Sequence, residues 1–277
     1  MRGVLYIVST PIGNLEDITL RALRILKEVD VIAAEDTRHS AKLLNHYGIK
    51  KPVISYWEEK EKVRSEEIIK RLQSGQSIAL ISDAGTPGIS DPGEVVIRKA
   101  LDEKFDVIPV PGPSALIAAL SVSGLPLREF TFIGFLPSKG TQRQKVLQEL
   151  SMERRTLVFY EAPHRIIETL QDMHDIFGNR NAAVFKELTK IHEEVFRGPL
   201  EKVISEVKGS KVAGEFVIVI EGRGKEGGSI EDALKEVLTL IKRGTSRKDA
   251  VRMVADTYGL SKRELYERSL KRVTRYE

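Results

Sequence analysis

The stretch that decides the fold is SDAGTPGISDPG (residues 82–93), which directly follows the apolar run SIALI (residues 77–81). Such a run is typical of a buried strand, and a loop with three glycines and two prolines ends it. Two similar loops, STPIGN (residues 9–14) and PVPGPSA (residues 109–115), also follow apolar runs. Ligands of open parallel sheets bind at the carboxyl ends of the strands, where glycine leaves the backbone accessible. Each loop alone also fits an ordinary turn, but the three together predict a ligand site lined by backbone.

The order of elements predicts an α/β fold. Up to Gly124, apolar runs alternate with amphipathic helical stretches, which indicates a parallel sheet covered by helices on both faces. Strands and helices recur after Leu125, but two predicted strands lie close together near residues 190–196, which favours a mixed sheet. We therefore expect an N-terminal α/β domain over residues 1–124 and a second α/β domain over residues 125–222.

A basic helical module is expected at residues 229–277, after a glycine-rich linker. Helical stretches there are separated by Gly244 and Gly259, with Ser246 and Ser261 as candidate N-caps, in a helix-turn-helix-like pattern. This segment carries 12 Lys and Arg against 8 Asp and Glu, which accounts for the net charge of +4 of the chain. An RNA-binding role fits this excess, and so does an ordinary solvated surface or a protein-docking element.

Several kinds of site are absent from the sequence. It has no cysteine, which excludes disulfides, thiolate zinc sites and cysteine nucleophiles. It holds neither G-x-x-x-x-G-K-[ST] nor G-x-S-x-G, and its five histidines are scattered. Its apolar runs are shorter than the ~20 residues of a membrane span, and the N-terminal run is too short for a signal peptide. We expect a cytoplasmic protein with no metal and no membrane contact, whose site takes a nucleoside-like ligand without a phosphate.

Four stretches together resemble the tetrapyrrole methylase superfamily of S-adenosylmethionine (SAM) enzymes. They are LYIVSTPIGNLEDITLRALRILKEVDVIAAEDTR (residues 5–38), SDAGTPGISDPG, VPGPSA (residues 110–115) and FYEAPHRI (residues 159–166). They are most similar to the branch that methylates small-subunit ribosomal RNA, and the basic tail is similar to the C-terminal extension of that branch. The resemblance covers about residues 4–222. It implies two α/β/α domains of the tetrapyrrole methylase type, SAM in the cleft between them, and a homodimer.

The resemblance also implies which residues contact SAM. The first glycine loop of the superfamily falls on residues 9–14, where this chain has lost two glycines and its proline stands at Pro11. Thr86 occupies the position of an aspartate in relatives, and Asp83, three residues earlier, is a candidate replacement. The implied cofactor-binding residues are Ile12, Asp83, Ala84, Gly85, Thr86, Ile89, Ser114, Ala115, Glu161 and Leu188.

Methyl transfer to a hydroxyl needs alignment of the reacting atoms and benefits from a general base. Glu35, Asp36 and Arg38 combine two acids and a cation just after the second predicted strand, so they are the preferred catalytic candidates. Asp36 equally fits a helix cap, and Arg38 equally fits an RNA phosphate contact. Glu161 is as good a candidate for a cofactor neighbour as for a base.

The implied activity is SAM-dependent 2′-O-methylation of a cytidine in the decoding region of 16S ribosomal RNA, within a small ribosomal subunit. RNA contacts are expected from the basic tail and from Lys139, Arg143 and Lys145. Two alternatives stay open: methylation of a small tetrapyrrole, and a non-enzymatic RNA-binding protein with a degenerate methylase core. The sequence leaves open the nucleotide, the general base, and whether free RNA or an assembled subunit is the substrate.

Overall fold

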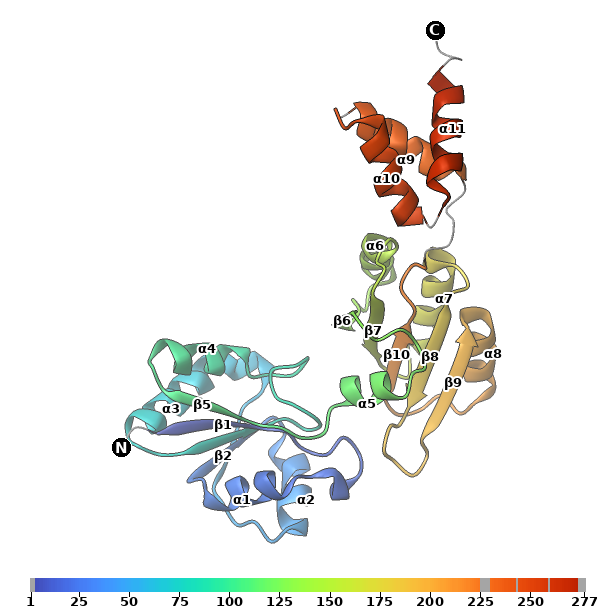
Figure 1. Cartoon of the computed structure of the whole chain (residues 1–277). Coiled ribbons are helices and arrows are strands. Elements are labelled where there is room, and N and C mark those ends of the chain that lie inside the picture. The colour runs from blue at the N-terminus through green and yellow to red at the C-terminus, as the bar shows by residue number, and fades with distance from the viewer. Residues whose placement is uncertain (1–2, 225–229, 243, 259, 274–277) are drawn as a thin grey trace. The chain divides into compact units, whose positions relative to one another are not determined.

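A computed structural model describes residues 3–224, 230–242, 244–258 and 260–273 of the chain. Within these ranges it contains two five-stranded sheets, each with its own helices, and a helical segment after residue 229 (Figure 1). Both sheets belong to one compact unit, Met1–Ser151 with Arg155–Glu221. The second unit consists of Met152–Arg154 with Gly222–Glu277.

The first sheet is parallel throughout, as the sequence predicts, with strand order β3-β2-β4-β1-β5. Its strands are β1 (Val4–Val8), β2 (Val31–Ala34), β3 (Val53–Ser55), β4 (Ile78–Ile81) and β5 (Asp106–Val110). Every residue of β2 and of β4 is buried, because helices cover both faces. The loop at residues 82–93 follows β4, the central strand, so it starts in the middle of the carboxyl edge of this sheet.

The helices of the first sheet lie on its two faces. They are α1 (Leu20–Glu28), α2 (Thr37–His46), α3 (Glu61–Gln73) and α4 (Glu94–Asp102). One apolar core holds Leu26 and Leu43 from the α1 and α2 side, and another holds Ile68 and Val96 from the α3 and α4 side. Figure 1 shows these two helix pairs on opposite faces.

The second sheet is mixed, also as predicted, with order β6-β7-β10-β8-β9. Its strands are β6 (Phe130–Phe135), β7 (Thr156–Glu161), β8 (Asn181–Lys186), β9 (Glu194–Pro199) and β10 (Phe216–Ile220). Strands β6 and β7 run parallel, whereas β10 is antiparallel to both β7 and β8. The helices that follow the strands are α6 (Gly140–Leu150), α7 (Ile166–Phe177) and α8 (Leu200–Gly209). They pack on one face of this sheet around Leu147, Leu170 and Val203.

The other face of the second sheet is covered differently. Helix α5 (Ala115–Ser121) packs there through Ala119 and Leu120, and Ile12 from the first glycine loop joins the same cluster. Ser114 caps α5 by accepting a hydrogen bond from Ile117 N at 3.5 Å, as expected from its place before the helix. Residues of both halves of this unit therefore share one apolar cluster, and the candidate site lies in it.

The helical segment contains α9 (Ile230–Lys242), α10 (Arg247–Tyr258) and α11 (Lys262–Val273), which pack around their own apolar core. The predicted caps are confirmed, because Ser246 Oγ accepts from Asp249 N at 3.1 Å and Ser261 Oγ from Glu264 N at 3.4 Å. Most of the predicted linker, residues 225–229, lies outside the described residues. In the described part of the chain, no helix is both long enough and apolar enough to span a bilayer.

Candidate functional site: a cavity formed by three glycine loops

The three glycine loops predicted to form a site are joined to one another. Thr10 and Gly85 form an antiparallel bridge, in which Thr10 N donates to Gly85 O at 2.8 Å and Gly85 N donates to Thr10 O at 3.0 Å. The Ser9 and Thr86 hydroxyls are 2.8 Å apart. A Cβ atom on Gly112 would lie 2.9 Å from Ser9 Cβ, so only glycine permits this approach. The missing side chain of Gly112 thus serves the packing of one loop on another.

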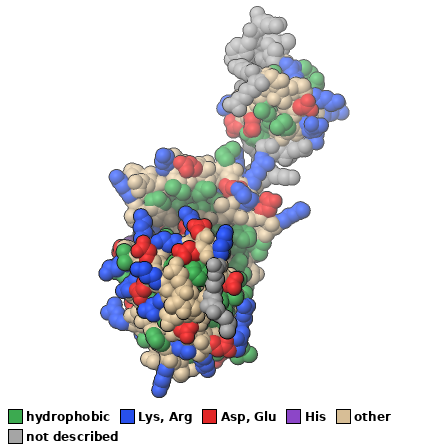
Figure 2. Space-filling model, turned by 90° about the vertical axis from the view of Figure 1, so that its left-hand side faces the viewer, with side chains coloured by type: hydrophobic (Ala, Val, Ile, Leu, Met, Phe, Trp, Pro, Cys, Tyr) green, Lys and Arg blue, Asp and Glu red, His purple; other side chains and the backbone are tan. Residues whose placement is uncertain are grey.

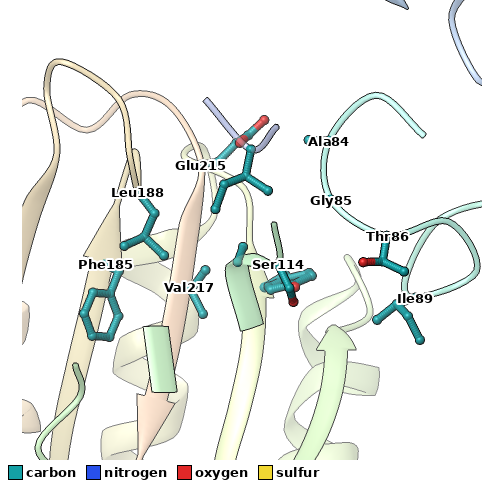
Figure 3. Close-up of a pocket in the computed structure, with 12 residues that line it drawn as sticks. Ala84, Gly85, Thr86, Ile89, Ser114, Phe185, Leu188, Glu215 and Val217 are labelled. Atoms are coloured by element: carbon teal, nitrogen blue, oxygen red, sulfur yellow. The ribbon is translucent and has the colours of Figure 1, made fainter. Parts of the chain in front are cut away.

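A cavity lies beside these joined loops. Its volume is about 80 Å³, and it opens to solvent on one side. In Figure 3, the loop with Ala84, Gly85, Thr86 and Ile89 is on one side, and Phe185, Leu188, Glu215 and Val217 are on the other. The lining residues are Ile12, Ala84, Gly85, Thr86, Ile89, Ser114, Ala115, Tyr160, Phe185, Leu188, Glu215 and Val217.

The wall formed by the second sheet is a single cross-strand row. Val217 of β10 pairs with Tyr160 of β7 on one side and with Phe185 of β8 on the other. The Tyr160 hydroxyl accepts a hydrogen bond from Leu116 N at 3.1 Å, which ties α5 to this wall. Burial raises the pKa of Tyr160, so its hydroxyl stays protonated near neutral pH. The row supplies a largely apolar surface with one fixed hydroxyl.

Charge in the lining is limited to one sign. Among the described residues, the lining includes the carboxylate of Glu215 and no lysine or arginine. Lys190 Nζ lies 3.1 Å from Glu215 Oε2 and 2.8 Å from Glu187 Oε1. The cavity therefore suits a ligand that is apolar over much of its surface and that carries positive charge.

Leu188 is held in the lining by an unusual backbone. Its two neighbours, Glu187 (φ 53°) and Thr189 (φ 65°), both adopt the left-handed conformation that costs a non-glycine residue free energy. The Glu187 carboxylate stabilises this turn by accepting from Lys190 Nζ at 2.8 Å and from Glu215 N at 3.0 Å. Burial opposes ionisation of Glu187, but these bonds to its carboxylate outweigh it and lower its pKa. The turn is thus fixed in position before any ligand arrives.

Most of the predicted cofactor residues meet at this cavity, and two do not. Ile12, Ala84, Gly85, Thr86, Ile89, Ser114, Ala115 and Leu188 line it. Asp83 and Glu161 lie outside the lining as the structure describes it. Asp83 instead connects the loop to helix α2, because its Oδ1 accepts from Asp36 N at 3.1 Å. Its own N–H donates to Glu35 Oε2 at 3.3 Å.

Glu161 is enclosed in the second half of the unit. Its side chain is 0% exposed and forms an ion pair of 2.6 Å with Arg165. Its carboxylate also accepts from Thr169 Oγ1 at 2.7 Å and from Ala162 N at 2.8 Å. These partners occupy both carboxylate oxygens, so the contacts of Glu161 in the structure are those of a residue that fixes the start of α7.

The three catalytic candidates also lie outside the described lining. Asp36 is the N-cap of α2 and accepts from Arg38 N at 2.8 Å and from His39 N at 3.4 Å. The bond from Arg38 N holds the pKa of Asp36 below its usual value. The Arg38 side chain is 91% exposed. Glu35 lies closer to the site, because it contacts Asp83 in the second glycine loop.

The expectation that Arg143 contacts RNA is wrong. Its side chain is 1% exposed and pairs with Glu168 at 2.7 Å and with Asp172 at 2.6 Å. An arginine enclosed in this way joins α6 to α7 and cannot reach a phosphate. Lys139 and Lys145, by contrast, are exposed.

Sequence reasoning missed four lining residues: Tyr160, Phe185, Glu215 and Val217. Three of them form the cross-strand row, and their alignment depends on strand register, which a single sequence does not display. The sequence did offer a signal for Glu215 as a site residue, because an acid stands there directly before an apolar strand.

Comparison with known proteins shows the family to which the chain belongs. The model of the family "Tetrapyrrole (Corrin/Porphyrin) Methylases" matches residues 4–204, and that of the "RsmI C-terminal HTH domain" matches residues 228–272. Ribosomal RNA small subunit methyltransferase I of Synechocystis sp. is 47% identical over 97% of this chain and 98% of its own. The protein of the same name from Halalkalibacterium halodurans is 45% identical over 96% of this chain and 94% of its own.

A solved structure shares the fold. Uroporphyrin-III-C-methyltransferase from Thermus thermophilus superposes with a TM-score of 0.59 at 21% identity, covering 79% of this chain and 94% of its own. The resemblance seen in the glycine loops is thereby confirmed over nearly the whole sequence. The chain belongs to the tetrapyrrole methylase family and, within it, to the ribosomal RNA small subunit methyltransferase I group.

Proposed function

We propose that the protein transfers a methyl group from SAM to ribosomal RNA of the small subunit. The observation that carries this proposal is the cavity formed by the three glycine loops, in a chain that matches the named methyltransferases over almost its full length. The family supports the methylase activity, and the relatives' names support the RNA substrate.

The residues of the cavity fit SAM. Phe185, Leu188 and Val217 offer apolar surface to an adenine ring, and the backbone of the loop around Gly85 offers hydrogen-bonding groups to the polar parts of a nucleoside. Glu215 supplies a negative charge to a ligand that carries a sulfonium and an ammonium group. A ligand of nucleoside size needs roughly 300 Å³ or more, so it would fill the mouth of the cavity as well as the enclosed part.

When bound, SAM supplies an activated methyl group on a sulfonium. The protein then has to orient an acceptor, exclude water and accept a proton. The joined loops and the fixed turn at Leu188 provide orientation, because both are held by hydrogen bonds within the protein. Tyr160 and the apolar row provide a surface that excludes water.

We further propose that the acceptor is the 2′-hydroxyl of a cytidine in the decoding region of 16S ribosomal RNA, presented in an assembled small subunit. The support is the resemblance of the glycine loops to the branch with this activity. Since ribosomal subunits are cytoplasmic, we propose that the protein acts in the cytoplasm.

We propose the division of labour expected from the sequence: residues 1–124 provide the glycine-loop half of the SAM site, residues 125–222 the other half, and residues 229–277 an RNA contact. In the last segment, Lys248, Arg252, Lys262 and Arg263 gather along a groove between α10 and α11. Four cations along one groove suit a phosphate backbone. Removing residues 229–277 tests this role: RNA methylation should fall while SAM affinity is kept, and unchanged methylation would refute it.

We also propose a homodimer. The segment from α5 to β6 exposes several large apolar side chains: Ile117, Val122, Leu127, Phe130 and Phe135. Clustered exposed apolar residues on a soluble surface are typical of association sites. Elsewhere, as on the face in Figure 2, Lys and Arg side chains are intermixed with Asp and Glu. Sedimentation of the wild type and of Phe135→Glu tests the dimer, which the charge should weaken.

The activity is tested with labelled SAM and small ribosomal subunits that lack the modification, followed by nucleoside analysis. Label on a ribose 2′-oxygen of cytidine is expected, and subunits that already carry the modification serve as the control. Label on a base would overturn the proposed acceptor. Absence of label on RNA, with transfer to a porphyrin substrate instead, would overturn the RNA substrate.

A further inference from the structure

A groove in the helical segment runs between α10 and α11, which pack against each other (Figure 1). Its volume is about 540 Å³, which is typical of sites for small organic groups. The residues that line it are Lys248, Val251, Arg252, Lys262, Arg263, Tyr266 and Glu267. Val251 is 3% exposed and belongs to the core of the segment, whereas the other side chains are exposed. The groove therefore has an apolar floor and charged edges.

Tyr266 presents an aromatic ring to this groove. The preceding residue, Leu265, is fully buried in the core of the segment, which places Tyr266 on the outer side of α11, where it is 40% exposed. The Tyr266 hydroxyl has no hydrogen-bond partner among the described residues. Tyr258 of the same segment, in contrast, is 9% exposed, and its hydroxyl donates to Glu236 Oε2 at 2.6 Å. The ring of Tyr258 thus serves the fold, whereas that of Tyr266 is available to a partner.

Two of the cations that line the groove are held by exposed ion pairs. Arg263 Nε lies 3.0 Å from Glu267 Oε1, and Arg252 Nη2 lies 3.1 Å from Asp249 Oδ1. At least half of each of these four side chains is exposed to solvent. Exposed ion pairs contribute little to stability, so the exchange of their carboxylates for phosphates costs the fold little.

The cations and the ring occupy two facing helix surfaces. Lys248 and Arg252 stand four residues apart on one face of α10. Lys262 and Tyr266 have the same spacing on α11. The lining holds four cations and one carboxylate, that of Glu267, and this excess attracts a polyanion. An aromatic ring among cations is typical of sites for single-stranded nucleic acid, in which the phosphates follow the positive groove and a base stacks on the ring.

We propose that this groove binds an unpaired stretch of ribosomal RNA, with one base stacked on the Tyr266 ring and the flanking phosphates beside the four cations. The inference rests on the proposed function, because that function makes RNA the partner of this segment. Unpaired loops of RNA suit such a site, since the faces of their bases are free to stack on a side chain. In a duplex those faces are already covered by neighbouring bases, so only the phosphates would be recognised.

The test measures binding of the full chain to a fluorescein-labelled single strand of about 10 ribonucleotides by fluorescence anisotropy. The variants are Tyr266→Ala, Tyr266→Phe and the control Met253→Ala, which changes a residue of α10 that is 53% exposed and lies outside the groove lining. We expect Tyr266→Ala to weaken binding about 5–150-fold, the range that corresponds to the stacking of one base. Tyr266→Phe and Met253→Ala should bind as the wild type does.

Two further probes separate the bases from the phosphates. One is a ribose-phosphate oligomer of the same length without bases, and the other is the same RNA sequence paired in a duplex. The wild type should bind both about tenfold or more weakly than the single strand, and Tyr266→Ala should bind the oligomer without bases as the wild type does. Lys248→Gln should lower the slope of log Kd against log salt concentration by about 0.7 for the single strand, whereas Tyr266→Ala should keep the wild-type slope.

Each opposite result overturns a stated part of the inference. Equal affinity of Tyr266→Ala and the wild type for the single strand would overturn the stacking role of Tyr266. Equal affinity of the wild type for the duplex and the single strand would overturn the assignment to unpaired RNA. Failure of the wild type to bind any of these probes would overturn the RNA site in favour of a protein partner.

Methylation of small subunits that lack the modification separates this inference from the proposed function. Tyr266→Ala should raise the apparent KM for the subunit, while its SAM affinity, measured by calorimetry, should equal that of the wild type. An unchanged KM in a protein that labels RNA would overturn the role of Tyr266 alone. A wild type that leaves ribosomal RNA unlabelled would overturn the proposed function itself.

Discussion

Replacing Asp91 by asparagine should stabilise the protein, by an amount that grows with pH. In the unfolded chain an aspartate ionises near its usual pKa of 3.8, whereas burial and Glu35 keep Asp91 protonated in the folded protein up to about pH 7. Between these values the folded state binds more protons than the unfolded state, so the stability of the wild type falls as pH rises. Asparagine cannot ionise and escapes this loss.

The magnitude follows from the two pKa values. A displacement from 3.8 to about 7 corresponds to about 4 kcal/mol in the free energy of unfolding when it is fully expressed. The carboxyl is only half-buried, and solvent screening reduces the effect to about 2 kcal/mol. The difference between Asp91→Asn and the wild type should therefore be near zero at about pH 4 and should reach about 2 kcal/mol at about pH 8.

Urea unfolding followed by tryptophan fluorescence measures this difference. The chain has one tryptophan, Trp57, which lies two residues after the end of β3 in the sheet that carries the Asp91 loop. Asp106→Asn, which changes an exposed aspartate at the start of β5, serves as the control for the loss of an aspartate carboxylate in the same sheet. If Asp91→Asn is no more stable than the wild type at pH 8, or differs from it equally at every pH, the proposed environment of Asp91 is refuted.

Three further substitutions separate structural roles from binding roles. Glu161→Gln should lower the free energy of unfolding by about 3–5 kcal/mol in urea, because it leaves the ion-pair partner Arg165 without its buried carboxylate; full stability with lost SAM binding would contradict this. Asp83→Ala should cost about 1 kcal/mol through the lost bond to Asp36 N, and calorimetry should show SAM affinity reduced by less than about tenfold; a larger loss would make Asp83 a cofactor ligand. Gly85→Ala should cost about 1 kcal/mol at φ 80° and weaken SAM binding by displacing the loop, whereas unchanged affinity would show that the loop does not hold SAM.

The fold was predictable because a strand that is buried on both faces of a sheet has a continuously apolar sequence. A strand such as Val31–Ala34 is apolar throughout, and the helices between strands show their own period. The loop side of the site was predictable for a related reason: glycine and proline after a strand are local signals. These signals located Gly85 and Thr86 without any knowledge of distant contacts.

The rest of the site depends on contacts that the sequence does not display. Tyr160 and Phe185 meet beside Val217 only because of the register of three strands. The roles of charged residues were hardest to predict, because the sequence around an acid at a strand end does not show whether the acid faces a ligand or a nearby arginine. Glu161 and Arg143 are both buried, and each pairs with a residue of its own half of the unit.

The joined glycine loops have a consequence for protein engineering. The Ser9 and Thr86 hydroxyls share one hydrogen bond, so Ser9→Ala and Thr86→Val remove the same interaction from opposite ends. The double variant should then lose little more stability than either single variant, with a coupling energy of about 0.5–3 kcal/mol. The backbone bridge between Thr10 and Gly85 and the contact of Gly112 with Ser9 extend this dependence to the third loop. Measurements of single substitutions in these loops will therefore not predict which combinations of substitutions still fold. Variant libraries aimed at this cavity should vary the three loops jointly.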